Sequence, residues 1–147
     1  MGIRRKSREI IIQTFYALTY EERDTYLNNL SFLSKYQEVL ENVSLENNIP
    51  PQGKVFALSE KIIKNMIPKI EEIDEIIKKN LGNVKIDKLG VLDVIILRLA
   101  VYEMLIEKTP PIVMINEAVD LAKMFCAEKT PALINAILDK IRGSCEL

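Results

Sequence analysis

The stretch from Val91 to Ile106 constrains the fold more than any other part of this chain, because it is almost continuously apolar. Its only charged residues are Asp93, Arg98 and Glu103. An apolar segment of this length predicts a helix that is buried on most of its faces. It is nevertheless shorter than the ~20 residues of a membrane span. The sequence therefore predicts a central helix with other elements packed around it.

Apolar residues recur at helical spacing on both sides of this segment. The chain has only five glycines in 147 residues, and β-branched residues seldom alternate with polar ones, so sheets are not expected. Thr130 and Pro131 predict the N-cap and first residue of the last helix, and Gly143 its end. The predicted fold class is all-α, with about seven helices over residues 4–22, 25–43, 54–67, 69–81, 88–108, 112–125 and 130–143.

The chain lacks the commonest general base in catalysis, which is also the commonest metal ligand. It contains no histidine, and Cys126 and Cys145 form no CxxC pair and fit a reducing cytoplasm. The phosphate-binding, dinucleotide-binding and nucleophile-elbow motifs are all missing. With 48% hydrophobic and 28% charged residues, we expect one cytoplasmic domain over residues 1–147, without enzymatic activity, cofactor, metal or membrane anchor.

A second feature is the basic cluster Arg4, Arg5, Lys6 and Arg8 at the start of the first predicted helix. It holds four of the chain's 20 Lys and Arg, so the remaining 16 face 21 Asp and Glu and the rest of the chain is acidic. A signal peptide is excluded, because the apolar run Ile10–Ile12 is shorter than a secretory core of about 7–15 residues. Two interpretations of the basic cluster stay open: it is a solvated helix end, or it is a surface that binds an anionic ligand.

Electrostatics favours the anionic ligand. Cations at a helix N-terminus oppose the helix dipole, which costs ~0.3–1 kcal/mol each when they are exposed. At about 100° per residue, Arg5, Ile12 and Tyr16 share one side of the helix. Ile11 and Phe15 turn inward. Cations for phosphates beside a tyrosine for base stacking suit a single-stranded nucleic acid.

Two polar features inside apolar segments have structural interpretations. Arg98 is expected to form an ion pair with Glu103, with Asp93 or with a residue of another helix. The pair Asn116–Glu117 follows two prolines, and Glu117 suits the first turns of a helix because of the helix dipole. No second carboxylate is placed to act with it in catalysis.

Three consecutive motifs lie in the C-terminal half of the chain, and together they resemble the NusB family of transcription antitermination proteins. They are VLDVIILRLAVYEM (91–104), PPIVMINEAVDLAKMF (110–125) and EKTPALINAILDKI (128–141). The Arg-rich opening with Glu9 and Gln13 is similar to the family as well. The resemblance implies two packed helical groups that bind boxA RNA together with NusE, a small-subunit ribosomal protein. It also implies antitermination in ribosomal RNA operons, within a complex of RNA polymerase, NusA and NusG.

The resemblance assigns roles to individual residues. By this resemblance, the basic cluster of this chain (Arg4, Arg5, Lys6 and Arg8) would contact RNA. Tyr16 would lie at both the RNA-binding and the NusE-binding surfaces. Asp93 matches an acidic position on the NusE side, where it could pair with basic residues of a ribosomal protein.

Four positions depart from the family pattern. Cys126 and Ala136 replace glycines, Leu133 replaces an aromatic residue that could stack on RNA, and Ala132 replaces a lysine. Cys126 is expected to cost backbone strain, because a helix C-cap of this kind favours the left-handed conformation of glycine. Lys129 is expected to supply the missing cation to RNA.

Two other functions stay open. The chain could be a helical scaffold or a homodimer with weak RNA binding, in which the dimer buries the basic helix. It could also be an accessory domain for RNA modification, since similar domains occur fused to RNA cytosine methyltransferases.

Overall fold

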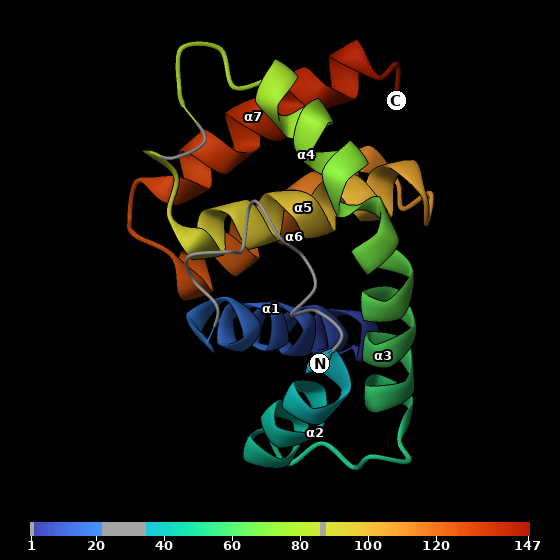
Figure 1. The fold of residues 1–147 in the computed structure, drawn as a ribbon. Helices are drawn as coiled ribbons and strands as arrows, with labels where there is room; N and C mark the ends of the chain where they lie inside the picture. The colour runs from blue at the N-terminus through green and yellow to red at the C-terminus, as the bar shows by residue number, and fades with distance from the viewer. Residues whose placement is uncertain (1, 22–34, 86–87) are drawn as a thin grey trace. The chain divides into compact units, whose positions relative to one another are not determined.

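The computed structural model of the chain describes residues 2–21, 35–85 and 88–147. Within these ranges it contains seven α-helices and no strand (Figure 1), so the all-α prediction is confirmed. A short 3-10 turn, η2 (Ile67–Lys69), joins α3 to α4. The helices are α1 (Ile3–Glu21), α2 (Tyr36–Glu46), α3 (Lys54–Met66), α4 (Ile70–Lys79), α5 (Val91–Leu105), α6 (Pro111–Phe125) and α7 (Thr130–Ser144).

These helices gather into two compact units, Met1–Pro68 and Lys69–Leu147. The first unit holds α1 to α3 and the second holds α4 to α7. Among the residues described, no helix combines the length and the apolar character needed to cross a membrane. A single functional domain over residues 1–147 stays a prediction.

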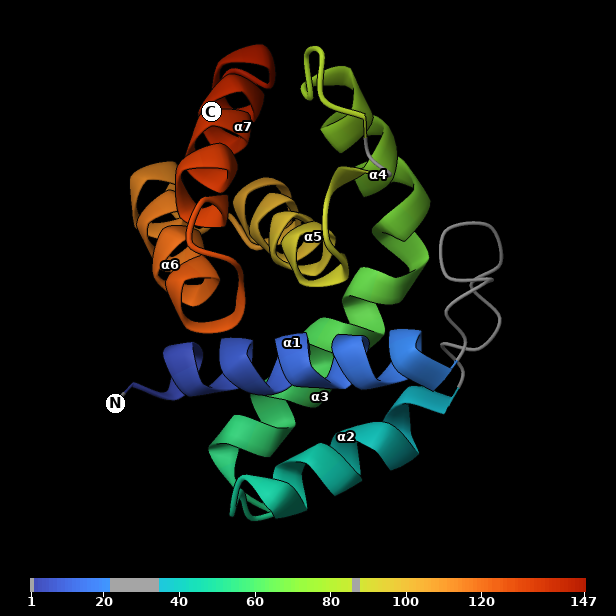
Figure 2. The same cartoon turned by 90° about the vertical axis from the view of Figure 1, so that its left-hand side faces the viewer.

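In the first unit, α1 packs against both α2 and α3 (Figure 2). Two hydrogen bonds join α1 to α3: Ser7 Oγ donates to the Val55 carbonyl at 3.3 Å, and Ser59 Oγ donates to the Ser7 carbonyl at 3.5 Å. Asn47 Nδ2 donates to Gln13 Oε1 at 2.9 Å, which joins α1 to the end of α2. Ile11 and Phe15, which were expected to turn inward, are both buried, and so are Thr14 and Leu18 on the same face.

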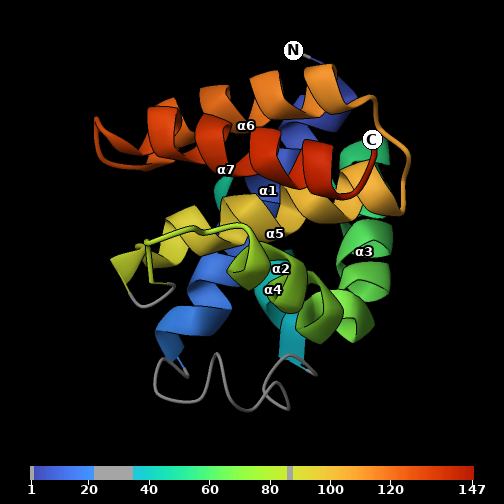
Figure 3. The same ribbon diagram turned by 90° about the horizontal axis from the view of Figure 1, so that it is seen from above.

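In the second unit, α5 is the central helix and contacts α4, α6 and α7 (Figures 1 and 3). Every residue from Val94 to Met104 is buried, which confirms the central helix. The partner of Arg98 is Asp74 on α4, with Nε to Oδ1 and Nη2 to Oδ2 both at 2.7 Å. The expectation of a partner on another helix is therefore confirmed. This two-point ion pair joins α4 to α5.

Some helix ends differ from those predicted from the sequence. The second helix, expected over residues 25–43, is described only from Tyr36, and residues 25–34 lie outside the described ranges. Thr130 is the first helical residue of α7 and not its cap, because Lys129 occupies the N-cap position without a side-chain cap bond. Gly143 does not end α7, which continues to Ser144, since this glycine does not adopt a positive φ.

Candidate nucleic-acid interface

The basic cluster lies in the first two turns of α1, and its four cations differ in exposure. Arg4 is exposed and forms no ion pair with any residue that the structure describes. Arg5 and Lys6 are half-buried, and Lys6 Nζ lies 3.6 Å from Glu9 Oε1. Arg8 is only 5% exposed. Arg4 therefore has the greatest freedom to meet an anion in solution, and Arg8 has the least.

Tyr16 lies further along the same helix and is 42% exposed. At 1.5 Å per residue it is about 16 Å beyond Arg5 along the helix axis. Ile12, expected on the same side, is fully buried, so the exposed side of α1 is narrower than the helical wheel predicts. An exposed aromatic ring is a platform on which a base can stack. Helix α1 thus carries a cationic end and the accessible ring of Tyr16.

Lys129 lies on the turn between α6 and α7, exposed and without an ion pair to any described residue. Cys126 begins this turn with φ −114° and ψ 174°, which is extended backbone. The left-handed conformation expected there is therefore wrong. Extended backbone is open to every L-residue, so cysteine in place of glycine causes no backbone strain at this position.

Asp93 lies in the first turn of α5 and is half-buried. Its Oδ2 accepts a hydrogen bond from the Gly90 N–H at 2.9 Å and so caps α5. The pKa of the Cys126 thiol is raised from 9.0 to about 12, first by burial, then by a hydrogen bond to Asp93, then by the charge of that carboxylate. Asp93 thus holds the start of α5 through Gly90, and Cys126 stays a protonated thiol at neutral pH.

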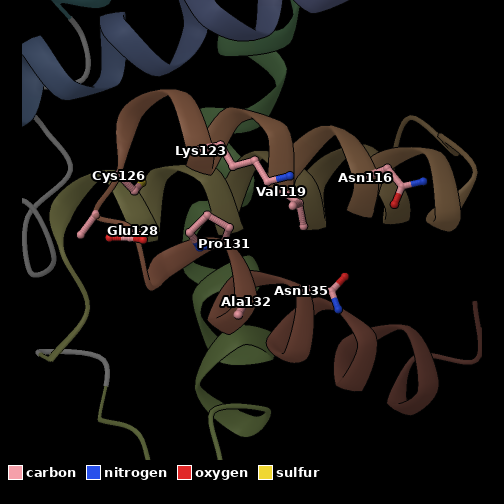
Figure 4. Close-up of a pocket in the computed structure, with 9 residues that line it drawn as sticks. Asn116, Val119, Lys123, Cys126, Glu128, Pro131, Ala132 and Asn135 are labelled. Atoms are coloured by element: carbon pink, nitrogen blue, oxygen red, sulfur yellow. The ribbon is translucent and has the colours of Figure 1, made fainter.

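A groove of about 810 Å³ runs between α6 and α7 (Figure 4), and we call it the α6–α7 groove. Five small or apolar residues line it, namely Val119, Cys126, Ala127, Pro131 and Ala132. Asn116 and Lys123 contribute polar groups from α6, and Asn135 contributes one from α7. The two asparagines point toward the space between the helices in Figure 4. The lining therefore combines small apolar residues with two amides, one cation (Lys123) and one carboxylate (Glu128).

The sequence reading missed the α6–α7 groove. It assigned Asn116 to the start of a helix and gave Asn135 and Lys123 no separate role. Asn116 and Asn135 each follow an isoleucine in one of the two motifs that resemble the NusB family, at 110–125 and 128–141. Their positions in these motifs were the only sequence signal for a shared role. The structure places Asp93, Cys126 and Lys129 in the second unit with the groove, while the basic cluster and Tyr16 belong to the first unit.

Comparison with known proteins agrees with the motifs. The family model described as the NusB family matches residues 5–142. The transcription antitermination protein NusB of Clostridium botulinum (strain Kyoto / Type A2) is 37% identical over 141 residues, which cover 94% of this chain and 98% of that protein. The crystal structure of antitermination factors NusB and NusE in complex with dsRNA contains a similar chain, with a TM-score of 0.77, 28% identity and 98% of each chain covered.

A crystal structure of T. maritima NusB is similar as well, with a TM-score of 0.77 and 26% identity, covering 100% of this chain and 99% of that one. The match therefore extends over both compact units and includes every motif that carried the resemblance. This chain belongs to the NusB family.

Proposed function

We propose that this chain is a non-enzymatic transcription antitermination factor that binds boxA RNA of ribosomal RNA operon transcripts together with NusE. The observation that carries the proposal is the exposed cationic start of α1 with an exposed tyrosine on the same helix. Support also comes from a relative 28% identical to this chain that was crystallised with NusE and dsRNA. Membership of a family of transcription factors supports a function without catalysis.

The proposed RNA contacts follow the exposure of each side chain. Arg4 contributes the strongest phosphate contact of the basic cluster, Arg5 and Lys6 contribute less, and Arg8 the least, because a buried guanidinium reaches few phosphates. Tyr16 stacks on a base. Lys129 adds a cation from the α6–α7 turn.

The proposed NusE contacts involve Tyr16 and Asp93. Asp93 is half-buried and already accepts a hydrogen bond from Gly90, so only part of its carboxylate is available to a basic partner. A half-buried carboxylate at the rim of an interface acts mainly through electrostatic complementarity with its partner. This complementarity affects the association rate and the choice of partner. RNA polymerase, NusA and NusG would join the same antitermination complex.

The test is fluorescence anisotropy with a short boxA-type RNA and a scrambled RNA of equal length. The chain is titrated alone and then with purified NusE. We expect tighter binding of the boxA-type RNA, and a further gain in affinity with NusE. Equal and weak binding of both RNAs, unaffected by NusE, would reject the proposal. Light scattering on the same samples reports whether the chain acts as a homodimer.

A further inference from the structure

Five exposed lysines gather on the second unit, and we call them the lysine patch. They are Lys78 and Lys79 in the last turn of α4, Lys85 and Lys88 in the segment that joins α4 to α5, and Lys140 on α7. None of the five forms an ion pair with any residue that the structure describes. Their ammonium groups are therefore available to an anion in solution.

Consecutive turns hold four of these lysines close together. The Leu81 N–H donates to the Lys78 carbonyl at 3.5 Å, and the Val84 N–H donates to the Leu81 carbonyl at 3.1 Å. The Lys88 N–H donates to the Lys85 carbonyl at 2.9 Å. A turn of this kind keeps its first and fourth residues within about 7 Å of each other. The segment after α4 thus folds back on itself and concentrates its cations.

Helix α7 reaches the same segment through Lys140. A Cβ added to Gly82, just after α4, would lie 3.2 Å from Lys140 Nζ, so this ammonium group lies directly against the segment. Helices α4 and α7 also contact each other. In Figure 2 the last turns of α4 and helix α7 both lie above α5. Lysines from two helices and from the connection between α4 and α5 therefore share one surface.

Helix dipoles account for only part of this surface. The two lysines of α4 complement the negative C-terminal end of their helix, which is worth ~0.3–1 kcal/mol each. Lys85 and Lys88 lie outside every α-helix, so no helix of their own stabilises them there. Like charges held close together also repel one another. The position of these two lysines therefore has no explanation within the fold.

The lysine patch has an excess of positive charge. Segment 78–88 holds four lysines and one carboxylate, Asp87, and Lys140 adds a fifth cation. The neighbouring carboxylates along α4 and α7 are Glu75 and Asp139, so cations still outnumber acids by five to three. The whole chain is slightly acidic, with 20 Lys and Arg against 21 Asp and Glu. A local excess of this kind indicates an anionic partner.

Composition favours a phosphate backbone over a protein surface as that partner. Protein–protein interfaces are depleted in lysine and depend on aromatic, methionine and arginine anchors in a desolvated core. Segment 78–90 contains none of these anchors, and its Leu81 is buried. Nucleic-acid interfaces are more polar and much more positively charged. Lysine meets a phosphate as a point charge, and such a contact does not depend on the base.

We propose that the lysine patch binds the phosphate backbone of RNA that extends beyond the boxA element. This inference rests on the proposed RNA-binding function and adds a contact that is independent of sequence. Lys129, the proposed RNA contact, immediately precedes α7, and Lys140 lies about 16 Å further along the helix axis. Roughly five nucleotides cover this distance at the ~3.4 Å per phosphate of a stacked strand. A short extension of the RNA is therefore long enough to reach the patch.

The experiment uses the full chain with NusE and RNAs of two lengths. One is a boxA-type core, and the other is the same core with a tract of about ten uridines at its 5′ or its 3′ end, twice the length required. Lys85→Gln/Lys88→Gln is compared with wild type and with Lys61→Gln/Lys64→Gln, which removes two exposed cations of α3. We expect the tract at one end to tighten wild-type binding. The patch variant should lose that gain, and the α3 variant should keep it.

Salt dependence gives an independent readout. Two lost phosphate contacts should flatten the plot of log affinity against log salt by about 1.4 on the extended RNA only. Between ~50 and 200 mM salt, the advantage of wild type over the patch variant should therefore shrink roughly sevenfold. Circular dichroism should show equal melting of wild type and both double variants, since the altered side chains are exposed and the Lys88–Lys85 hydrogen bond joins backbone groups.

Four results would overturn the lysine-patch proposal. The tract could leave wild-type affinity unchanged at both ends, or the two double variants could bind the extended RNA equally well. The patch variant could lose as much affinity for the core as for the extended RNA. It could also weaken binding of NusE in the absence of RNA and spare RNA binding, which would assign the patch to a polypeptide.

Failure of this proposal is distinct from failure of the proposed function. If wild type with NusE prefers the boxA-type core to a scrambled core and gains nothing from either tract, only the lysine-patch proposal fails. If both cores bind alike and the tract still tightens binding through Lys85 and Lys88, only the boxA function fails.

Discussion

Removing the carboxylate of Asp74 should destabilise the second unit strongly, because it removes a two-point ion pair from a guanidinium that is buried in the central helix. Arg98 has a side chain that is only 1% exposed, and it forms two contacts of 2.7 Å with Asp74. Loss of one partner of a buried ion pair costs about 3–5 kcal/mol. The Asp74 side chain is 13% exposed, so water can partly reach the vacated site and the lower end applies.

We therefore expect Asp74→Ala to lower the free energy of unfolding by about 3 kcal/mol, a large part of the ~5–15 kcal/mol of a typical domain. The melting temperature should fall by roughly 6–12 °C for a chain of this size. Urea denaturation followed by far-UV circular dichroism measures the free energy. The control is Glu72→Ala, which breaks the exposed Lys69–Glu72 pair at 3.8 Å and should change stability by less than ~0.5 kcal/mol.

A further variant tests whether loss of the Asp74–Arg98 ion pair is the cause of the instability. Asp74→Leu with Arg98→Met removes both charges and keeps apolar volume, so it should recover most of the stability that Asp74→Ala loses. The reasoning is refuted if Asp74→Ala costs no more than Glu72→Ala. It is also refuted if the double variant is as unstable as Asp74→Ala, because packing would then account for the loss.

Further predictions concern RNA binding and the Cys126 thiol. Arg4→Ala should reduce the slope of log affinity against log salt by about 0.7, whereas Lys54→Ala, an exposed cation at the start of α3, should leave the slope unchanged. Tyr16→Ala should weaken RNA binding by about 1–3 kcal/mol and Tyr16→Phe by far less, measured by anisotropy; equal losses would argue against stacking. In a Cys145→Ser background, the Cys126 thiol should react slowly with a disulfide reagent until the pH approaches its pKa of about 12. Asp93→Ala should shift this rate profile to lower pH, because it removes a hydrogen bond and a negative charge that raise the pKa, while burial still holds the pKa above 9.0. An unchanged profile would contradict this assignment.

Periodicity and local chemistry were sufficient to predict most of the fold. The apolar stretch in residues 91–106 predicts a buried helix from composition alone, and α5 is buried at every position from Val94 to Met104. The first helix was placed within one residue at each end, because its apolar spacing and its cationic start are local signals. Helix ends were less predictable. Lys129 rather than Thr130 occupies the N-cap position of α7. The backbone conformation decides which residue stands at this position, and several residue types can adopt that conformation.

The sequence by itself determined the all-α class, the family and the cationic, aromatic character of the first helix, because these depend on residues that are near neighbours in the chain. Only the tertiary structure decided which partner Arg98 takes, since Asp74 lies on a different helix. It also decided the extended backbone of Cys126, the burial and the nearby Asp93 that raise the pKa of its thiol, and the groove between α6 and α7. Each of these depends on how separate helices pack, and helix packing is set by the shapes of whole faces rather than by any short run of residues.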